Sequence, residues 1–219
     1  MKAKYRLALF DLDGTLTDSG PGIKSCVAET LKFMGRPVPP ENFLRRFIGP
    51  PLWDSFTKLS GMGEKDANDA VRHYRKLYNT SGIYNNSVYK GIPQLLRDLK
   101  QAGTALAVAT SKPRSMAKTV LDYFSLFPLF SFVSAADESD KGNGKEELIL
   151  PVLKKTGFPP ESAVMIGDTK FDASGAARSG VNFIGVLYGF GTESEMRREG
   201  ASVFAADSAG LRNLLIDKT

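Results

Sequence analysis

Two pairs of aspartates are the residues in this sequence best suited to chemistry. Asp11 and Asp13 stand in the run Asp-Leu-Asp-Gly-Thr. Asp168 and Asp172 stand in Gly-Asp-Thr-Lys-Phe-Asp. Neighbouring carboxylates repel, so one tends to hold a proton unless a cation lies between them. Four carboxylates without a histidine or cysteine ligand set favour Mg²⁺, a hard cation that also bridges to phosphate oxygens. The pattern therefore predicts a Mg²⁺ site that acts on a phosphate group.

These residues follow apolar runs that we predict to be strands. The runs suit parallel strands covered on both faces, and they span residues 5–10, 105–109, 162–166 and 183–187. Helical patterns alternate with them at residues 92–101, 113–124, 145–156 and 170–179. This alternation predicts an α/β fold with an open, doubly wound, mostly parallel sheet of the Rossmann-like type. A ligand in such a sheet lies beyond the carboxyl ends of the strands, so Asp11, Thr110 and Asp168 are expected to converge there.

The stretch between the first strand and residue 89 has a different pattern. Helical periodicity covers residues 21–34 and 64–78, and a loop-rich part with several prolines lies between them. We therefore predict an all-α helical domain inserted into the α/β core. The insertion is assigned to residues 17–89, and the core to residues 1–16 together with residues 90–219.

The motifs resemble those of the haloacid dehalogenase-like (HAD) hydrolase superfamily, over essentially the whole chain. Its four motifs are similar, in order, to residues 11–15, Thr110, Lys145, and Gly167-Asp168 with Asp172. The helical insertion resembles the small cap of the phosphoglycolate phosphatase-like subfamily. Further stretches similar to that subfamily are residues 10–19, 110–113 and 185–191.

The resemblance implies a role for each aspartate. Asp11 would be the nucleophile that forms an aspartyl-phosphate. Asp13 would protonate the leaving oxygen and then deprotonate the attacking water. Asp11, Asp168 and the backbone carbonyl of Asp13 would hold Mg²⁺, and Asp172 would support the metal directly or through water.

A second group of residues is expected to bind the phosphate or the substrate: Gly14, Thr110, Ser111, Lys112 and Lys145. Thr110 and the backbone of Ser111 would donate hydrogen bonds to phosphoryl oxygens. Lys145 would balance the charge of the phosphate and the nucleophile, although Lys141 lies four residues earlier and competes for this role. We favour Lys145 because it opens a helical pattern, and the start of a helix favours anions.

We predict a phosphatase that acts on a small phosphate monoester, with phosphoglycolate as the first candidate substrate. A nucleoside 5′-monophosphate is the second, which would make the protein a 5′-nucleotidase, and other sugar phosphates remain open. A phosphomutase would use the same scaffold but hold back water during transfer. In a different class, a non-catalytic switch protein would be phosphorylated on Asp11, but such a switch needs neither Asp13 nor a large cap.

Composition argues against several other classes. The chain has 219 residues, of which 42% are hydrophobic and 24% charged, so it is globular rather than disordered. One cysteine (Cys26) and one histidine (His73) leave no intrachain disulfide and no two-histidine metal site. The formal charge of +5 is spread along the chain, which suits a small anionic substrate rather than nucleic acid.

No apolar run approaches the roughly 20 residues of a membrane span, and no signal peptide is recognised. We expect a cytoplasmic protein without a membrane partner, and a monomer by default.

Overall fold

The central element of the fold is a six-stranded sheet. The computed structural model describes residues 2–137 and 144–217. Neighbouring strands of this sheet all run parallel. Their order is β6 (Phe132–Ala136), β5 (Ala105–Pro113), β2 (Leu7–Phe10), β7 (Ala163–Gly167), β8 (Asn182–Val186) and β9 (Phe204–Ala205). After β2, strands β5 and β6 extend the sheet to one edge. Strand β7 then pairs with the other side of β2, and β8 and β9 extend the sheet to the opposite edge. The predicted α/β class is confirmed, and the boundary between β2 and β7 is the switch point where such sheets bind ligands.

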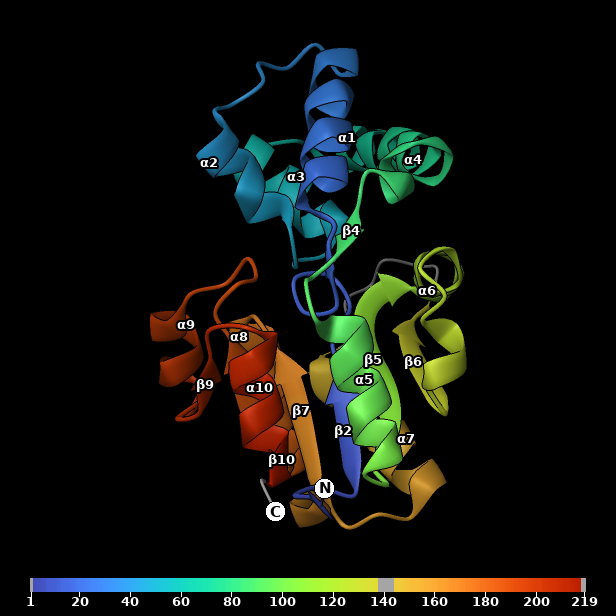
Figure 1. Ribbon diagram of the computed structural model, residues 1–219. Helices are drawn as coiled ribbons and strands as arrows, with labels where there is room; N and C mark the ends of the chain where they lie inside the picture. The colour runs from blue at the N-terminus through green and yellow to red at the C-terminus, as the bar shows by residue number, and fades with distance from the viewer. Residues whose placement is uncertain (1, 138–143, 218–219) are drawn as a thin grey trace.

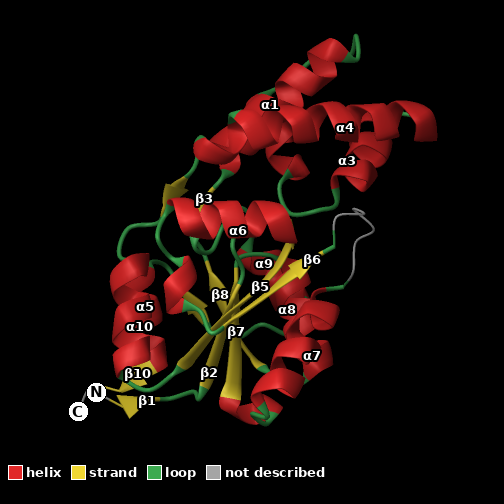
Figure 2. Ribbon diagram, turned by 90° about the vertical axis from the view of Figure 1, so that its right-hand side faces the viewer, coloured by secondary structure: helices red, strands yellow, loops and turns green. Residues whose placement is uncertain are grey.

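Alternate residues of the central strands face opposite sides of the sheet. In β2, Ala8 and Phe10 join one apolar cluster, whereas Leu7 and Leu9 join another. The first cluster includes residues of α5 (Ile92–Gln101), α6 (Arg114–Tyr123) and α10 (Ser208–Leu215). The second includes residues of α7 (Lys145–Thr156) and α8 (Lys170–Ser179). Figure 2 shows these helices on the two sides of the sheet. Because both faces are covered, the strands read as unbroken apolar runs.

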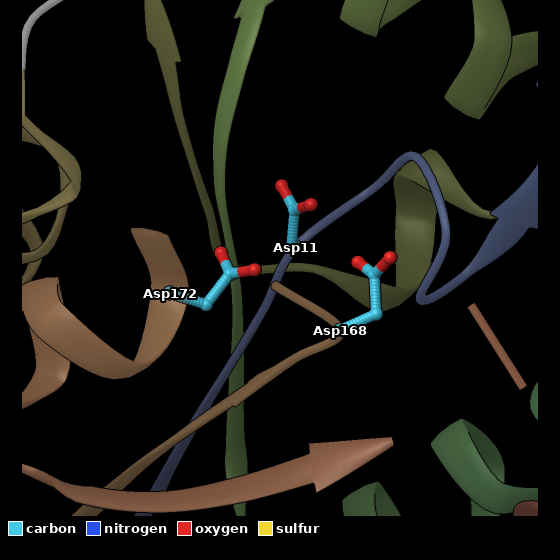
Figure 3. Close-up of side chains that lie close together, drawn as sticks. All are labelled: Asp11, Asp168 and Asp172. Atoms are coloured by element: carbon cyan, nitrogen blue, oxygen red, sulfur yellow. The ribbon is translucent and has the colours of Figure 1, made fainter. Parts of the chain in front are cut away.

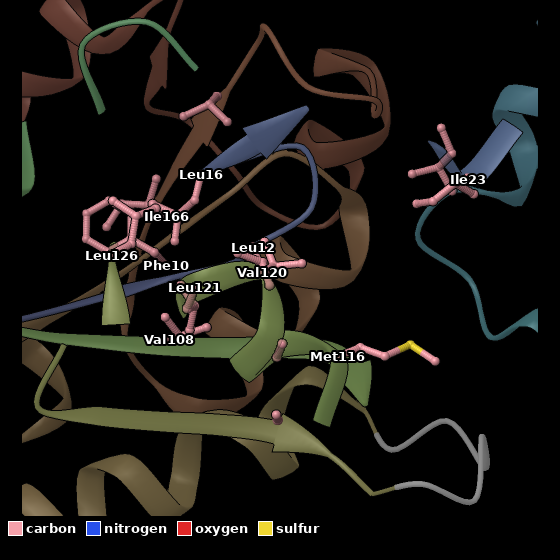
Figure 4. Packing of buried hydrophobic residues seen from close by; sticks show 14 of the residues in the cluster. Phe10, Leu12, Leu16, Ile23, Val108, Met116, Val120, Leu121, Leu126 and Ile166 are labelled. Atoms are coloured by element: carbon pink, nitrogen blue, oxygen red, sulfur yellow. The ribbon is translucent and has the colours of Figure 1, made fainter. Parts of the chain in front are cut away.

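The first cluster anchors the carboxyl end of β2. Figure 4 shows Phe10, Val108 and Ile166, from three neighbouring strands, among side chains of the α6 layer. The ring of Phe10 also meets the ring of Phe130 edge-on, with centroids 6.3 Å apart. This packing holds the backbone rigidly at the point where Asp11 follows the strand.

The helices that were predicted agree closely with the observed ranges, whereas α3 (Leu52–Ser60), α9 (Glu193–Arg198), α10 and both edge strands of the sheet, β6 and β9, were not predicted. Helices α5, α7 and α8 span the residues that the pattern indicated. Strand β6 escaped prediction because Ala135 alone among its five residues is fully buried. An edge strand that is half exposed lacks the apolar run that marks a central strand.

A helical cap is inserted after β2. It contains α1 (Gly20–Phe33), α2 (Glu41–Leu44), the 3₁₀ turn η1 (Arg45–Phe47), α3 (Leu52–Ser60), α4 (Glu64–Thr80) and the 3₁₀ turn η2 (Gly82–Tyr84). Figure 1 shows these helices grouped beyond the carboxyl ends of the strands. Helix α4 turns one apolar face inward, and its buried residues are Ala67, Ala70, Val71, Tyr74 and Tyr78. The cap therefore has its own apolar packing above the predicted site.

The chain passes between sheet and cap in two adjacent segments. Strand β3 (Thr17–Asp18) leads into the cap, and β4 (Ser87–Val88) leads back. The two strands pair antiparallel, with Thr17 opposite Val88. Two short paired links are suited to act as a hinge between the cap and the core.

The termini lie together at the end of the sheet away from the cap (Figure 1). Strand β1 (Lys2–Ala3) pairs antiparallel with β10 (Ile216–Asp217). The remaining elements are α9 (Glu193–Arg198) and the 3₁₀ turns η3 (Phe127–Leu129) and η4 (Pro160–Ser162). Among the helices of the described residues, none combines the length and the apolar character that a membrane crossing requires.

Candidate active site

Three aspartates from different parts of the chain meet at the carboxyl end of the sheet. Asp11 follows β2, Asp168 follows β7, and Asp172 lies in the first turn of α8 (Figure 3). Each is buried, and each offers a carboxylate oxygen within 4.8 Å of the others. The strand register explains the meeting, because Phe10 lies opposite Ile166 and the two strands end side by side. The convergence expected of parallel strand ends is thus present in the structure.

Two hydrogen bonds orient the carboxylate of Asp168. The hydroxyl of Thr15 donates to Oδ1 at 3.2 Å, and the backbone N–H of Phe190 donates to Oδ2 at 2.7 Å. Gly14 lies against the same carboxylate and adopts a φ of +90°. Burial raises the pKa of Asp168 to about 8, and the charges of Asp172 and Asp11 add to the effect. In the absence of a cation this carboxyl therefore favours its protonated form at neutral pH.

Asp172 is fixed from both of its oxygens. The backbone N–H and the hydroxyl of Thr169 donate to Oδ2 at 3.0 and 2.7 Å, and the backbone N–H of Asp172 donates to the Thr169 side chain, which completes the capping box of α8. Oδ1 lies 2.7 Å from Nζ of Lys145. Oδ2 accepts both hydrogen bonds from Thr169, whereas Oδ1 is buried without one and has only the ion pair with Lys145, so Oδ1 is the oxygen through which Asp172 can support a metal.

Lys145 neutralises part of the negative charge. Its Nζ donates to Asp11 Oδ1 at 2.8 Å and to the carbonyl of Ala109 at 3.2 Å, in addition to its ion pair with Asp172. Burial lowers the pKa of Lys145, but Asp11 and Asp172 raise it by more, so it remains an ammonium. Lys145 is the first residue of α7, as predicted. The competing Lys141 lies outside the described residues.

One buried ammonium does not balance three buried carboxylates. Burial raises the pKa of Asp11 to about 6, against the opposing effect of Lys145 and with a further increase from Asp172. Burial is the main cause of both raised pKa values, and repulsion between the carboxylates adds to it, so ionising the whole cluster is unfavourable without a further cation. A set of hard oxygen donors with such a deficit fits a divalent cation of the Mg²⁺ type. Asp11 and Asp168 are the residues that would hold it, with Asp172 behind them.

Asp13 lies beside this cluster but is bound to a different cation. Nζ of Lys112 donates to its two carboxylate oxygens, at 3.1 and 2.9 Å, and to the hydroxyl of Tyr78 at 2.7 Å. The metal contact predicted for Asp13 is through its backbone carbonyl, and it stays a prediction. The hydroxyl of Thr110 accepts from the backbone N–H of Lys112 at 3.2 Å, which leaves its own hydrogen for another acceptor.

A cavity of about 590 Å³ lies between the cap and the core, above these groups. Of the predicted site residues, its lining includes Asp11, Asp13, Thr110, Ser111, Lys112 and Lys145. Apolar residues of the cap and of α6 line it as well, among them Ile23, Leu52 and Met116. The structure therefore brings the predicted catalytic residues Asp11, Asp13, Thr110 and Lys145 and the predicted binding residues Ser111 and Lys112 to one cleft, whereas Gly14, Asp168 and Asp172 lie behind them.

Some residues of the site were not predicted. Thr15 and Phe190 orient Asp168, and Tyr78 meets Lys112. Tyr78 was assigned to the apolar face of a cap helix, and its hydroxyl gave no separate signal in the sequence. Arg45 of the cap donates from its guanidinium to the carbonyl of Gly189 at 2.8 Å and thus links the cap to the loop that holds Asp168.

Residues 8–186 match the haloacid dehalogenase-like hydrolase family. The chain belongs to this family, and its α/β fold with a helical cap is that of the family's hydrolases.

Individual relatives carry more specific names. The chain is 42% identical over 212 residues to a protein of Pseudomonas aeruginosa named 5′-nucleotidase. The aligned region covers 97% of this chain and 96% of that protein. The chain is 30% identical over 192 residues to phosphoglycolate phosphatase 1 of the same species, covering 84% of this chain and 70% of that one. A crystal structure described as a predicted phosphatase from Clostridium acetobutylicum superposes with a TM-score of 0.90 at 36% identity, over 96% of this chain and 97% of the other.

Proposed function

We propose that this protein is a Mg²⁺-dependent phosphatase that hydrolyses a small phosphate monoester through an aspartyl-phosphate on Asp11. The observation that carries the proposal is the buried cluster of Asp11, Asp168 and Asp172, of which Asp11 lines the cavity between the cap and the core. We also propose that the cap comprises residues 17–89 and the core residues 1–16 and 90–219.

In the first half-reaction, an oxygen of Asp11 forms a bond to phosphorus as the bond to the leaving oxygen breaks. The carboxyl group of Asp13 gives its proton to that leaving oxygen. Lys145, held on Asp11 Oδ1, limits the nucleophile to its other oxygen and offsets its charge. The hydroxyl of Thr110 has a hydrogen to donate to a phosphoryl oxygen. Mg²⁺, when bound, would screen the repulsion between the carboxylates and the phosphate.

In the second half-reaction, a water attacks the phosphorus of the aspartyl-phosphate. The carboxylate of Asp13 accepts a proton from that water, and the bond between phosphorus and the Asp11 oxygen breaks to release phosphate. Asp11 and Asp13 are then back in their starting protonation states.

Among the candidate substrates, two observations favour a nucleoside 5′-monophosphate. A relative that is 42% identical over nearly the whole chain is named 5′-nucleotidase. The cavity, at about 590 Å³ and with apolar side chains in its lining, falls in the roughly 300–1,000 Å³ range of pockets that enclose drug-sized ligands. Phosphoglycolate, a much smaller and fully polar molecule, remains the alternative and is supported by the relative of that name.

The test is release of inorganic phosphate from a panel of monoesters, with Mg²⁺ and with EDTA. The panel includes nucleoside 5′-monophosphates, phosphoglycolate and sugar phosphates, with Asp11→Asn as the control. We expect Mg²⁺-dependent release that is strongest for a nucleotide and absent in Asp11→Asn. Release that is confined to phosphoglycolate would replace the substrate assignment. A folded protein that binds Mg²⁺ and releases phosphate from nothing would refute the phosphatase proposal and favour a phosphomutase or a phospho-aspartate switch.

A further inference from the structure

Lys112 is a buried cation between the cap and Asp13. It lies near the end of β5, and its side chain is only 5% exposed. Its Nζ has two hydrogen bonds to the Asp13 carboxylate and one to the hydroxyl of Tyr78. An ammonium group has three donors, so these contacts account for all of them. The lysine therefore faces Asp13 and Tyr78 rather than presenting a free charge to the cavity.

The position of Lys112 is fixed by more than its three hydrogen bonds. Its Nζ lies 4.6 Å from the centroid of the Tyr78 ring, close enough for a cation–π contact. Its backbone N–H donates to Thr110. Burial lowers the pKa of Lys112, but the Asp13 carboxylate and Tyr78 raise it by more, so the group stays charged.

The ammonium in turn sets the orientation of Asp13. One nitrogen contacts both oxygens of the carboxylate, at 3.1 and 2.9 Å, which fixes the direction in which the group points. The side chain of Asp13 is 19% exposed and lines the cavity. Without Lys112, water would be the competing partner and the carboxylate would be free to rotate. Proton transfer depends on a donor placed within hydrogen-bond reach of the reacting oxygen.

Tyr78 moves with the cap because it belongs to the packing of α4. It is 1% exposed and stacks on Tyr74, one turn earlier, with ring centroids 5.5 Å apart and planes 11° from parallel. Its hydroxyl is therefore a rigid point of the cap that reaches Lys112 of the core. The contact exists only while the cap is docked, because the two links at β3 and β4 are the covalent connections between the parts.

We propose that Lys112 is a positioning residue that orients Asp13 for proton transfer. In this proposal the contact between Lys112 and Asp13 depends, through Tyr78, on the docked position of the cap. The inference rests on the proposed function, in which Asp13 exchanges protons with the leaving group and with water. When the cap is docked, Tyr78 takes one donor of the ammonium and leaves the other two on Asp13. When the cap moves away, water reaches the ammonium and Asp13 is released. Proton transfer is thereby tied to the state in which the cavity is closed.

The proposal is distinct from a direct contact between Lys112 and the phosphate. A phosphate ligand contributes to substrate binding and to the first half-reaction, so its loss raises KM and slows phosphorylation of Asp11. A positioning residue for Asp13 affects every step that needs a proton transferred. With p-nitrophenyl phosphate the leaving group needs little protonation, so the step that suffers is hydrolysis of the aspartyl-phosphate.

The experiment compares Lys112→Met, Lys112→Arg and Tyr78→Phe with the unaltered protein, by rapid mixing with p-nitrophenyl phosphate and Mg²⁺. We expect Lys112→Met to lower kcat by about 10- to 100-fold, less than the roughly 10²–10⁴-fold that a general acid–base group contributes. It should also show a burst approaching one p-nitrophenolate for each active site, since the aspartyl-phosphate accumulates. Lys112→Arg, which keeps the charged donors, should recover part of kcat and reduce the burst.

Tyr78→Phe removes the hydroxyl that binds Lys112 and keeps both Lys112 and Asp13, so it tests the link to the cap alone. We expect it to lower kcat by about 10-fold, the factor equivalent to one hydrogen bond of ordinary strength. The matched control is Tyr84→Phe, which removes a hydroxyl from a cap tyrosine that is 46% exposed. This control should keep the kinetics of the unaltered protein.

The outcomes separate the inference from the proposed function. If the unaltered protein releases no phosphate from any monoester, the proposed function fails. If it turns over normally but Lys112→Met raises only KM, or loses activity without a burst, the inference alone fails. Thermal unfolding supplies a readout that is independent of turnover. The losses in Tm of Lys112→Met and Tyr78→Phe should be less than additive in the double variant, and additive losses would overturn the link between cap and lysine.

Discussion

Replacing Gly14 by alanine should displace the carboxylate of Asp168. A Cβ built on Gly14 would lie 2.2 Å from Oδ2 of Asp168, 2.6 Å from its Cγ and 2.7 Å from its Oδ1. Ordinary contacts begin near 3.4 Å, so the carboxylate would have to move by about 1 Å. That movement breaks the hydrogen bonds from Thr15 and from the backbone N–H of Phe190 that orient Asp168.

The substitution has a second effect, which a matched variant isolates. Gly14 has a φ of +90°, where a residue with a Cβ is strained by about 1–2 kcal/mol. Gly103 has a similar φ of +87° but no atom within 4 Å of its Cβ position, so Gly103→Ala carries the strain alone. Gly189 has no such φ, and its Cβ would lie 2.3 Å from the Cβ of Asp168 and 2.5 Å from the backbone oxygen of Gly14, so Gly189→Ala displaces both without the strain in φ.

The assays are thermal unfolding and the Mg²⁺ concentration that gives half-maximal phosphatase activity. Each kcal/mol of destabilisation lowers Tm by about 2–4 °C in a protein of this size. We therefore expect Gly103→Ala to lower Tm by about 2–8 °C and to leave the Mg²⁺ requirement unchanged. Gly14→Ala and Gly189→Ala should raise the required Mg²⁺ concentration by about 10- to 100-fold, the usual effect of disturbing the partners of a metal ligand.

The result that would refute this reasoning is a Gly14→Ala protein with an unchanged Mg²⁺ requirement. It would mean that Asp168 either tolerates the displacement or does not hold the metal. If Gly103→Ala raised the Mg²⁺ requirement as much as Gly14→Ala, the effect would come from general destabilisation rather than from the clash.

Three further predictions concern the charges of the site. Asp11→Asn should abolish turnover yet raise the Tm measured in EDTA at pH 8. Burial disfavours the ionised form of Asp11, whose pKa is raised to about 6, and asparagine carries no charge. A lower Tm would mean that the attraction between Asp11 and Lys145 outweighs the cost of burying the charge. Lys145→Met should lower the free energy of unfolding at pH 8 by about 3–5 kcal/mol in EDTA, since it leaves buried carboxylates without their ammonium. That loss should shrink when Mg²⁺ is added, whereas Lys4→Met, which breaks an exposed pair with Asp217, should cost about 1 kcal/mol or less in both conditions. In EDTA, the free energy of unfolding should fall as pH rises from about 4 to about 8, because folded Asp11 and Asp168 retain protons that the unfolded chain has released. Mg²⁺ displaces those protons, so the gain in Tm on adding Mg²⁺ should grow with pH. A gain in Tm that stays constant with pH would contradict the assignment of these aspartates to the metal site.

The position of the site was predictable because strand ends and motifs coincide. Asp11 and Asp168 each follow an apolar run that is buried on both faces, and parallel strands align their carboxyl ends. The helix starts were equally readable, since Lys145 and Lys170 open amphipathic patterns after polar loops. Strand β6, by contrast, was missed because an edge position leaves its residues half exposed and removes the periodic signal.

The partner of Lys112 could not be predicted from the sequence. Lys112 was expected near the substrate because it follows the strand that ends at Thr110. The register of β5 against β6 shifts between Thr110 and Pro113, and the lysine side chain meets Asp13 and Tyr78. Such a shift depends on how neighbouring strands and the cap pack, and no spacing within the motif encodes it.

The sequence by itself determined the fold class, the family and the aspartates that gather at the sheet, because burial of strands and the residue types of motifs are local properties. The tertiary structure decided how those groups are paired. It placed Lys145 between Asp11 and Asp172, closed a cavity between cap and core, and joined Tyr78 to Asp13 through one ammonium. These pairings link residues that lie between 27 and 134 positions apart, and only the docking of separate elements brings such residues into contact.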